Sequence, residues 1–558
     1  MMRTSIVIAV LVTSCSTPAV PPARFANASP VWLVNDRRDT PKKPKVSDNL
    51  VVFDWFDRSF ERPLTRPFEL NRQRRALGVN ALDEVPDSTW FTNRIGMHDL
   101  TDDQIRNGPL QDDSPAKHMP FTVKSTKLGG DPTQGLIVSD ARGVKLMIKF
   151  DAKEFPELQS ATHIVVSRLL WACGYNVPED EIIYIRPQDL IVPAGVPMED
   201  RLGQVQGYLT KPMLDKAFEK IAREPDGSIR VLASRWLPGK VIGGPPLTGT
   251  RDGDPNDRIP HELRRDLRGA FPIIAWVDHE DLVFGNFLDT WVPDRGDPHR
   301  HYVEHYFIDF GKSMGVMGGI DHTLRHGHRY VFDWPDTIVE FLGLGLTDRP
   351  WDHAFAPKLT GVSPLFVADH FDPGTWVPDI QYEPFQDMDR FDGFWGAKIM
   401  ARFRPDQIRA AVAAARYSDP RAADYVARTL IARQRATIAY WFARVNPLDR
   451  FTASADGDRA RLCFADLAVD TALAPTDGTH YAIEGFDSHG GKLARAAIVA
   501  ADASGTTCAQ LGLSPRDRDG YTVFAVRTLR PHFAGTTYVH VARDPATGTP
   551  RVIGIWRG

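Results

Sequence analysis

The chain is poor in cysteine and has little net charge of either sign. It contains four cysteines among 558 residues, and no two of them form the C-x-x-C pair typical of zinc sites. Its formal net charge of −4 gives no reason to expect a nucleic acid partner. The apolar run near its start covers only Ile6 to Val12, which is far too short to cross a bilayer. The length predicts two or three domains with an ample core.

The N-terminus carries the pattern of an export signal. Met1-Met2-Arg3 supplies a basic residue, the apolar run follows, and Thr13-Ser14-Cys15 places small residues before a cysteine. This order is typical of a bacterial lipoprotein signal peptide at residues 1–15, with Cys15 as the lipidation site. The alternatives are a plain signal peptide and a misplaced start. We expect a lipid-anchored protein of the cell envelope, at the outer membrane, with its folded domains in the periplasm.

Two short motifs carry the strongest chemical signal. Residues 279–286 read H-x-D-x-x-x-x-N, and Asp309-Phe310-Gly311 follows. Phosphoryl transfer needs an Asp that orients the attacking hydroxyl, and an Asn and a second Asp that hold magnesium ions. We therefore expect Asp281, assisted by His279, to be catalytic, and Asn286 and Asp309 to be ligands of Mg²⁺ or Mn²⁺. The alternative interpretation is an ordinary strand end with loop caps.

The chain upstream offers further parts of a nucleotide site. Lys145 to Phe150 alternates as a strand does, and Lys149 is the candidate contact to the phosphates. A segment containing Gly129 and Gly130 precedes it, although a plain hairpin turn would look the same. A helix is expected from Pro156 to Gly174, and Glu157 in its first turn is the candidate partner of Lys149. Acids also favour helix N-termini for electrostatic reasons alone.

With these parts the chain resembles the kinase-like superfamily in its atypical branch, close to HipA-type and phosphatidylinositol-kinase-like proteins. It also resembles an uncharacterised family of exported bacterial lipoproteins through residues 85–94, 174–179 and 264–269. The resemblance implies an α+β, bilobal fold with a β-rich N-lobe at 120–240, a helical C-lobe at 241–446, and ATP with Mg²⁺ as cofactors. The chain departs from the pattern because it has no Ala-Pro-Glu element and a long gap between Asn286 and Asp309. Both departures put recognition of a protein substrate of the eukaryotic type in doubt.

The remaining segments are assigned from composition and periodicity. We expect a flexible tether at 16–48, an extended element at 49–119 that packs on the main domain, and a small antiparallel β domain at 447–558. A strand is expected at 230–236, and helices are expected at 261–277, 406–416 and 422–445. Cys463 and Cys508 both lie in the β domain, where export permits a disulfide, but the sequence does not give their separation in space.

Two groups of histidines could suggest a metal site. His299, His301 and His305 precede Asp309, whereas His322, His326 and His328 follow Gly311. No H-E-x-x-H pattern accompanies either group, so a solvated loop or a substrate-contacting surface is the favoured interpretation, with metal chelation as the alternative.

Three functions follow from these patterns. The first is an ATP-dependent, membrane-anchored phosphotransferase of unknown acceptor, for which the source of ATP outside the cytoplasm is an open question. The second is an inactive, kinase-derived binding or scaffold lipoprotein of the envelope. The third is a metal-dependent hydrolase that uses the same residues on a phosphorylated substrate.

The leader predicts a simple fractionation result. The Cys15→Ser variant should leave the membrane fraction or persist as an unprocessed precursor, because the lipid would be attached at that thiol. Immunoblots of membrane and soluble fractions measure both. Wild-type protein that fractionates with the cytosol at full length would contradict the assignment of the leader.

Overall fold

The computed structural model describes ten ranges of the chain, which form two compact units. The described ranges are 24–46, 51–68, 75–111, 113–126, 135–199, 204–316, 326–457, 459–493, 496–503 and 505–558. One unit comprises Pro30–Pro447 with Thr471–Ala474, and the other comprises Met1–Ser29, Leu448–Asp470 and Pro475–Gly558. The expected α+β class is confirmed at this level, since helices accompany one large mixed sheet and three smaller antiparallel sheets. The expectations for Cys15, Gly129, Gly130 and His322 lie outside the described residues.

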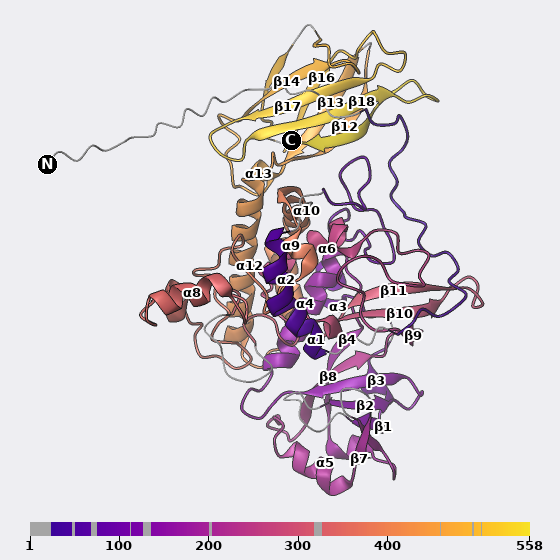
Figure 1. Cartoon of the computed structure of the whole chain (residues 1–558), viewed down its shortest axis with the longest axis vertical. Helices are drawn as coiled ribbons and strands as arrows, with labels where there is room; N and C mark the ends of the chain where they lie inside the picture. Colours follow the sequence, from indigo (N-terminus) through magenta and orange to yellow (C-terminus); the bar gives the residue numbers. More distant parts are fainter. Residues whose placement is uncertain are drawn as a thin grey trace, which may run out of the picture. The chain divides into compact units, whose positions relative to one another are not determined.

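The large sheet belongs to the first unit, and five of its strands are antiparallel neighbours. Their order is β4 (Asp180–Ile185), β8 (Ile229–Arg235), β3 (Lys145–Phe150), β2 (Gly135–Ser139) and β1 (Phe121–Thr126). The strands β5 (Leu190–Ile191) and β6 (Pro197–Glu199) run parallel to β1, and β7 (Val205–Tyr208) completes the order beyond β6. The predicted strands at 145–150 and 230–236 are therefore confirmed. An apolar core forms between this sheet and α5 (Lys211–Phe218), which lies beside β7 in Figure 1.

Helix α4 (Leu158–Cys173) connects β3 to β4 and is almost wholly buried. It ends at Gly174, which has a φ of 128°, and a Cβ there would lie 2.2 Å from the Phe91 ring. The predicted helix is confirmed with a later start, because Glu157 precedes it with a φ of 65° and serves as its N-cap.

The single helix predicted at 261–277 is wrong. The structure has three short pieces, η5 (His261–Leu263), α6 (Arg265–Arg268) and α7 (Phe271–Trp276). Pro272 accounts for the second break, because it has no N–H to donate and its ring clashes with the carbonyl four residues earlier. Gly269 at that break packs against Trp395, where a Cβ would approach the indole to 2.3 Å.

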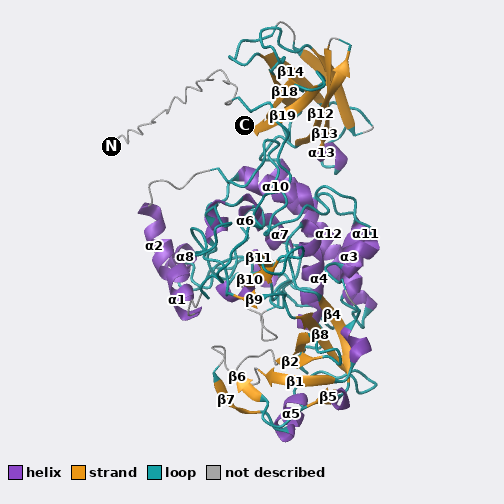
Figure 2. Cartoon of the chain, turned by 90° about the vertical axis from the view of Figure 1, so that its right-hand side faces the viewer, coloured by secondary structure: helices purple, strands orange, loops and turns teal. Residues whose placement is uncertain are grey.

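A second sheet of three strands fills the long gap between the two motifs. Its order is β11 (His301–Phe307), β10 (Phe287–Pro293) and β9 (Lys240–Val241), and all neighbours are antiparallel. Helices α10 (Arg390–Met400), α11 (Pro405–Ala414) and α12 (Pro420–Phe442) follow, and the last two confirm the predicted helices at 406–416 and 422–445. Figure 2 shows these helices in purple and the strands in orange.

The N-terminal part of this unit is helical where an extended element was expected. Arg58 lies in this region and is fully buried, with an ion pair to Asp54 at 3.1 Å one helical turn earlier. Buried pairing at this spacing stabilises a helix rather than an extended strand. The short helices of the described residues in this unit are α1 (Val51–Phe56), η1 (Asp57–Glu61), α2 (Arg62–Thr65), η2 (Arg66–Phe68), α3 (Asp102–Asn107), η3 (Pro115–His118), η4 (Pro187–Asp189), η6 (Phe284–Asn286), α8 (Trp334–Leu342), η7 (Pro350–His353) and α9 (Glu383–Gln386).

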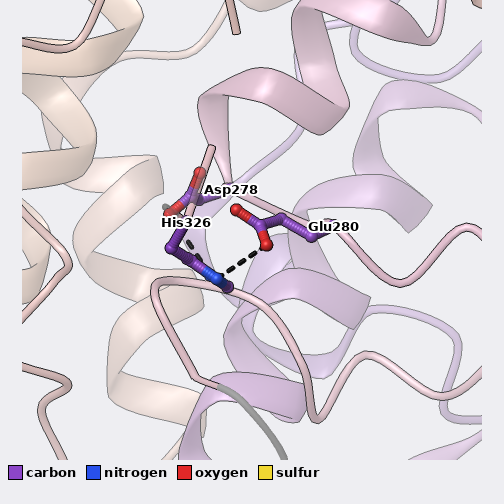
Figure 3. A group of neighbouring side chains, drawn as sticks. All are labelled: Asp278, Glu280 and His326. Atoms are coloured by element: carbon purple, nitrogen blue, oxygen red, sulfur yellow. Dashed lines mark ion pairs between the residues drawn. The ribbon is translucent and has the colours of Figure 1, made fainter. Parts of the chain in front are cut away.

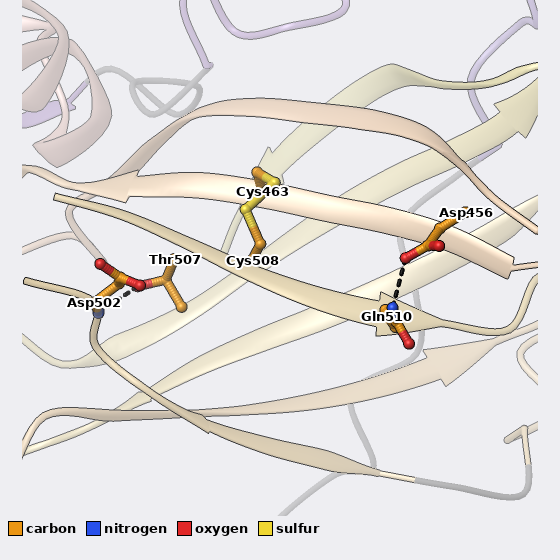
Figure 4. Close-up of a disulfide and its surroundings, with 6 residues drawn as sticks. All are labelled: Asp456, Cys463, Asp502, Thr507, Cys508 and Gln510. Carbon is orange, nitrogen blue, oxygen red and sulfur yellow. Dashed lines mark hydrogen bonds between the residues drawn. A yellow bond between two sulfur atoms is a disulfide. The ribbon is translucent and has the colours of Figure 1, made fainter. Parts of the chain in front are cut away.

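The second unit is made of two antiparallel sheets. Three strands form the order β12 (Leu448–Asp456), β13 (Arg459–Asp466) and β16 (Thr506–Leu511). Five form the order β15 (Ala497–Ala500), β14 (His480–Phe486), β17 (Thr522–Leu529), β18 (Gly535–Arg543) and β19 (Pro550–Arg557), and α13 (Leu467–Asp470) follows β13. Cys463 on β13 and Cys508 on β16 are register partners and form a disulfide (Figure 4).

The segment expected to be a flexible tether is fastened by specific contacts over its described part. In the second unit, the backbone N–H of Phe25 donates to the Tyr521 hydroxyl at 3.0 Å. In the first unit, Asp36 accepts from the backbone and hydroxyl of Thr89 at 2.7 and 2.9 Å. Buried hydrogen bonds of this kind order the backbone, which its composition did not indicate. Among the described residues, no helix combines the length and apolar character needed to span a membrane.

The disulfide predicts a local loss of stability when it is removed. It closes a loop with a sequence separation of 45, so the double variant Cys463→Ser, Cys508→Ser should lower the free energy of unfolding of this unit by about 2–4 kcal/mol. Hydrogen–deuterium exchange of peptides from β13 and β16 in increasing denaturant measures the change. The Cys173→Ala variant, which alters the buried thiol of α4 in the other unit, should leave that protection unchanged. Equal protection in the double variant and the wild type would contradict the prediction.

Candidate functional site

The hairpin β10–β11 brings the two motifs together. Its register pairs Phe287 with Phe307, so the residues on either side of the hairpin become neighbours. The backbone N–H of Ile308 donates to the carbonyl of Asn286 at 2.9 Å. Asn286 and Asp309 are therefore adjacent in space although a long insert separates them in the sequence.

The loop after α7 positions Asp281 through its backbone and its carboxylate. The amide Nδ2 of Asn286 donates to the backbone carbonyl of Asp281 at 2.6 Å. The amide oxygen of Asn286 takes no part in this bond. The Lys312 ammonium lies 3.1 Å from the Asp281 carboxylate. Burial alone would lower the pKa of Lys312, but the carboxylates of Asp281, Asp379 and Asp309 together raise it. The buried Arg58 supports the same loop, since its guanidinium donates to the Leu282 carbonyl at 2.7 Å.

An ion pair joins the large sheet to the second motif. The Nζ atom of Lys149 on β3 lies 2.7 Å from Oδ1 of Asp309. Burial alone would raise the pKa of Asp309, but the charges of Lys149 and His163 lower it overall, so this carboxylate is ionised at neutral pH. Its side chain is still 44% exposed, which leaves an oxygen accessible to a ligand in the cleft.

Two histidine rings fix the residue after Asp309. The Phe310 ring is fully buried, with the rings of His163 and His279 at centroid distances of 5.3 and 5.6 Å. The Nδ1 atom of His279 lies 2.8 Å from the Ser313 hydroxyl, and burial lowers the pKa of His279. His163 is held in turn by Asp180 on β4 at 2.8 Å. His279 is thus a neutral positioning group for this loop.

A cleft of about 370 Å³ opens beside the Lys149–Asp309 pair. Its polar lining comprises these two residues with His163, Ser234 and Arg235. The apolar lining includes Met147, Leu232, Trp236 and Ile308. A cleft that combines an apolar chamber with a few convergent charged groups is typical of a site for a small organic ligand.

Glu157 does not occupy the place predicted for it. Its carboxylate accepts from the backbone N–H of Ser418 at 3.1 and 3.3 Å, and the structure does not bring it to Lys149. The left-handed conformation of Glu157 turns its side chain toward the segment after α11 and not into the cleft. The expectation of a Glu157–Lys149 pair is therefore corrected, and Asp309 is the acid that pairs with Lys149.

The structure adds site residues that the sequence did not single out. His163 is one, because its place beside Phe310 depends on how α4 packs. Lys312 is another, and its position directly after the Asp309 motif was the only signal available. A separate cluster, outside this site, consists of Asp278 and Glu280, which precede Asp281, together with His326, which the sequence had pointed to. Burial, followed by the charges of Asp379 and Asp278, raises the pKa of Glu280 well above its usual range.

Two of the three histidines of the insert pack against tryptophans, whereas His299 is exposed in a turn, as expected for a solvated loop. His305 is buried, lies 2.7 Å from Asp289 and stacks on Trp90 at a centroid distance of 3.6 Å. His301 stacks on Trp291 at 3.8 Å. Neither of these interactions matches the solvated loop that the spacing suggested.

The chain was compared with protein-family models, with curated proteins and with solved structures, and none of the three comparisons gives a match. The function of the protein is therefore inferred from the geometry of this site.

Proposed function

We propose that the protein is a phosphotransferase of bilobal, kinase-like fold that binds ATP with Mg²⁺ or Mn²⁺ and acts on an acceptor hydroxyl. The observation that carries the proposal is the convergence of a sheet lysine with the two motifs. Lys149 meets Asp309 at 2.7 Å, and Asn286, held beside Asp309 by the hairpin, is bonded to the backbone of Asp281.

The order of elements around the cleft supports the kinase-like part of the proposal. An antiparallel sheet carries the lysine on its third strand, and the helix α4 follows directly. Strand β8 then leads to Trp236 at the rim of the cleft, where an interlobe hinge was expected. Gly285, Ile308 and Asp309 line the same cleft, and this proximity of the two motifs to the sheet supports a nucleotide held between two lobes.

The residues present fit a hard divalent cation. Mg²⁺ and Mn²⁺ prefer carboxylate and amide oxygens, and Asp309 offers an ionised carboxylate while Asn286 offers its amide oxygen. When bound, the cation would neutralise charge on the phosphates. Lys149 has three donors, of which Asp309 uses one, so two remain for phosphate oxygens.

The transfer step follows from these placements. The acceptor hydroxyl would donate its hydrogen bond to Asp281, whose carboxylate is oriented by Lys312. The bond between acceptor oxygen and γ-phosphorus forms while the bond between γ-phosphorus and the bridging oxygen breaks. The hydroxyl proton passes to Asp281 and ADP leaves. Anchoring through a lipid on Cys15 would place this reaction at the envelope surface.

The first test of this proposal is nucleotide binding. ATP with Mg²⁺ or Mn²⁺ should stabilise the full chain by about 2.7 kcal/mol at a ligand concentration a hundredfold above its dissociation constant. A thermal shift titration with each nucleoside triphosphate, with and without the cation, measures this. The absence of any shift would favour the alternative, a kinase-derived binding or scaffold lipoprotein.

The second test separates the roles of two acids. Asp309→Asn should weaken both nucleotide affinity and turnover, because it removes a cation ligand and the partner of Lys149. Asp281→Asn should keep affinity and lower the transfer rate by about a hundred to ten thousandfold, because it removes the proton acceptor. Calorimetric titration gives the affinity, and transfer of labelled phosphate to the protein itself or to candidate acceptors gives the rate.

Glu157→Gln is the matched control, because Glu157 was expected at the phosphates but contacts Ser418. It should change neither affinity nor rate. An equal loss of affinity in Asp281→Asn and Asp309→Asn would show that both acids serve the cation. Wild-type protein that binds ATP but transfers no phosphate would contradict the phosphotransferase proposal and favour a ligand-binding protein.

A further inference from the structure

A second cluster of metal-ligating side chains lies behind the catalytic loop. Asp278 and Glu280 flank His279 and precede Asp281, and His326 comes from the segment that follows the Asp309 motif. The residues are 3%, 2% and 7% exposed, respectively. Figure 3 shows the imidazole of His326 against both carboxylates, at 3.7 Å from Asp278 and 2.7 Å from Glu280. None of the three belongs to the nucleotide site proposed above.

The His326 ring is buried without satisfying its polar atoms. Neither Nδ1 nor Nε2 has a hydrogen-bond partner, because the 2.7 Å approach to Glu280 lacks the alignment that an N–H donor needs. The Oε1 atom of Glu280 is also buried without a partner. Native proteins rarely leave such groups unsatisfied, and each one costs about 1–3 kcal/mol. These three atoms lie in one cluster and are available as donor atoms to a ligand.

The remaining contacts leave the inner carboxylate oxygens available. Oδ1 of Asp278 accepts from the Trp376 indole at 2.7 Å and lies 3.3 Å from the Arg433 guanidinium. Its other oxygen faces His326. The backbone of Gly327 packs against Asp278, because a Cβ at Gly327 would lie 2.8 Å from Oδ1 of Asp278. Asp278, Glu280 and the neighbouring Asp379 thus place three acidic groups around one guanidinium, and a cation would relieve the repulsion between them.

The spacing and chemistry of the donors suit a transition metal. One ligand atom from each residue lies within 4.8 Å of the others, so small side-chain adjustments would bring all three to the bond lengths of about 2.0–2.2 Å that Zn²⁺ requires. An imidazole nitrogen with two carboxylate oxygens is a donor set that Zn²⁺ accepts readily and Mg²⁺ does not favour.

We propose that Asp278, Glu280 and His326 bind a divalent transition metal, with Zn²⁺ as the best match. This metal would fasten the segment at His326 to the catalytic loop and so position Asp281 from behind. Its role is structural, and it does not depend on whether the cleft binds a nucleotide.

The test is a metal titration of the full chain, purified without a histidine tag and stripped with chelator. After incubation with Zn²⁺ and desalting, elemental analysis should find about one bound ion per chain. The His326→Gln and Glu280→Gln variants should lose it, with affinity lowered by more than about a hundredfold, the upper end of the loss seen when only a supporting residue is removed. His353→Gln, which changes an exposed histidine, and Asp309→Asn should both keep the ion.

A second measurement covers variants that fail to fold. Co²⁺ added to the stripped wild type should give visible absorption bands, and X-ray absorption of the Zn²⁺ form should show nitrogen and oxygen ligands with one imidazole. Wild-type protein that retains no metal, or His326→Gln protein that folds and retains all of it, would overturn the proposal. In the first case the three side chains would contact one another without a metal.

Discussion

The site depends on one ion pair, between Lys149 on β3 and Asp309 after β11. The two residues come from a sheet and from a loop that lie 160 positions apart in the sequence. Asp309 adopts a left-handed backbone conformation with a φ of 60°, which Asp tolerates better than most residues. The ion pair keeps the Asp309 carboxylate ionised and fastens the loop after β11 to strand β3.

Backbone constraints on the other side make this pairing possible. The hairpin β10–β11 returns the chain to Asn286, and the amide of Asn286 fixes the carbonyl of Asp281. Phe310 anchors the loop from within through its contacts with His163 and His279. Each candidate site residue is therefore held by a neighbouring group, which is the usual condition for a site whose geometry is fixed within a fraction of an ångström.

The sequence was informative where structure follows from local pattern. The strand of Lys149, the helix α4 and the C-terminal strands depend on periodicity and turn residues, and they lie where periodicity predicted them. The break in the helix predicted at 261–277 has a signal in the sequence, because Pro272 interrupts a helix that would otherwise continue through it.

Long-range partners were beyond what the pattern could give. Glu157 is an acid at a position where a partner of Lys149 was expected. Its carboxylate instead accepts from the backbone N–H of Ser418, which lies far away in the sequence. Of the Asp278–Glu280–His326 cluster, the sequence pointed only to His326, because Asp278 and Glu280 lie directly before and within the motif of Asp281. Spacing identifies the residues that can do chemistry, whereas packing decides which of them meet.

The N-terminal segment shows the same limit of composition. Residues 16–48 have the composition of a flexible tether, yet Arg24 lies 3.3 Å from Asp519 and the backbone N–H of Phe25 donates to the Tyr521 hydroxyl. Such contacts depend on where a distant strand places a single side chain, which local composition does not record. A few specific polar contacts are therefore enough to order a segment that composition alone assigns to a linker.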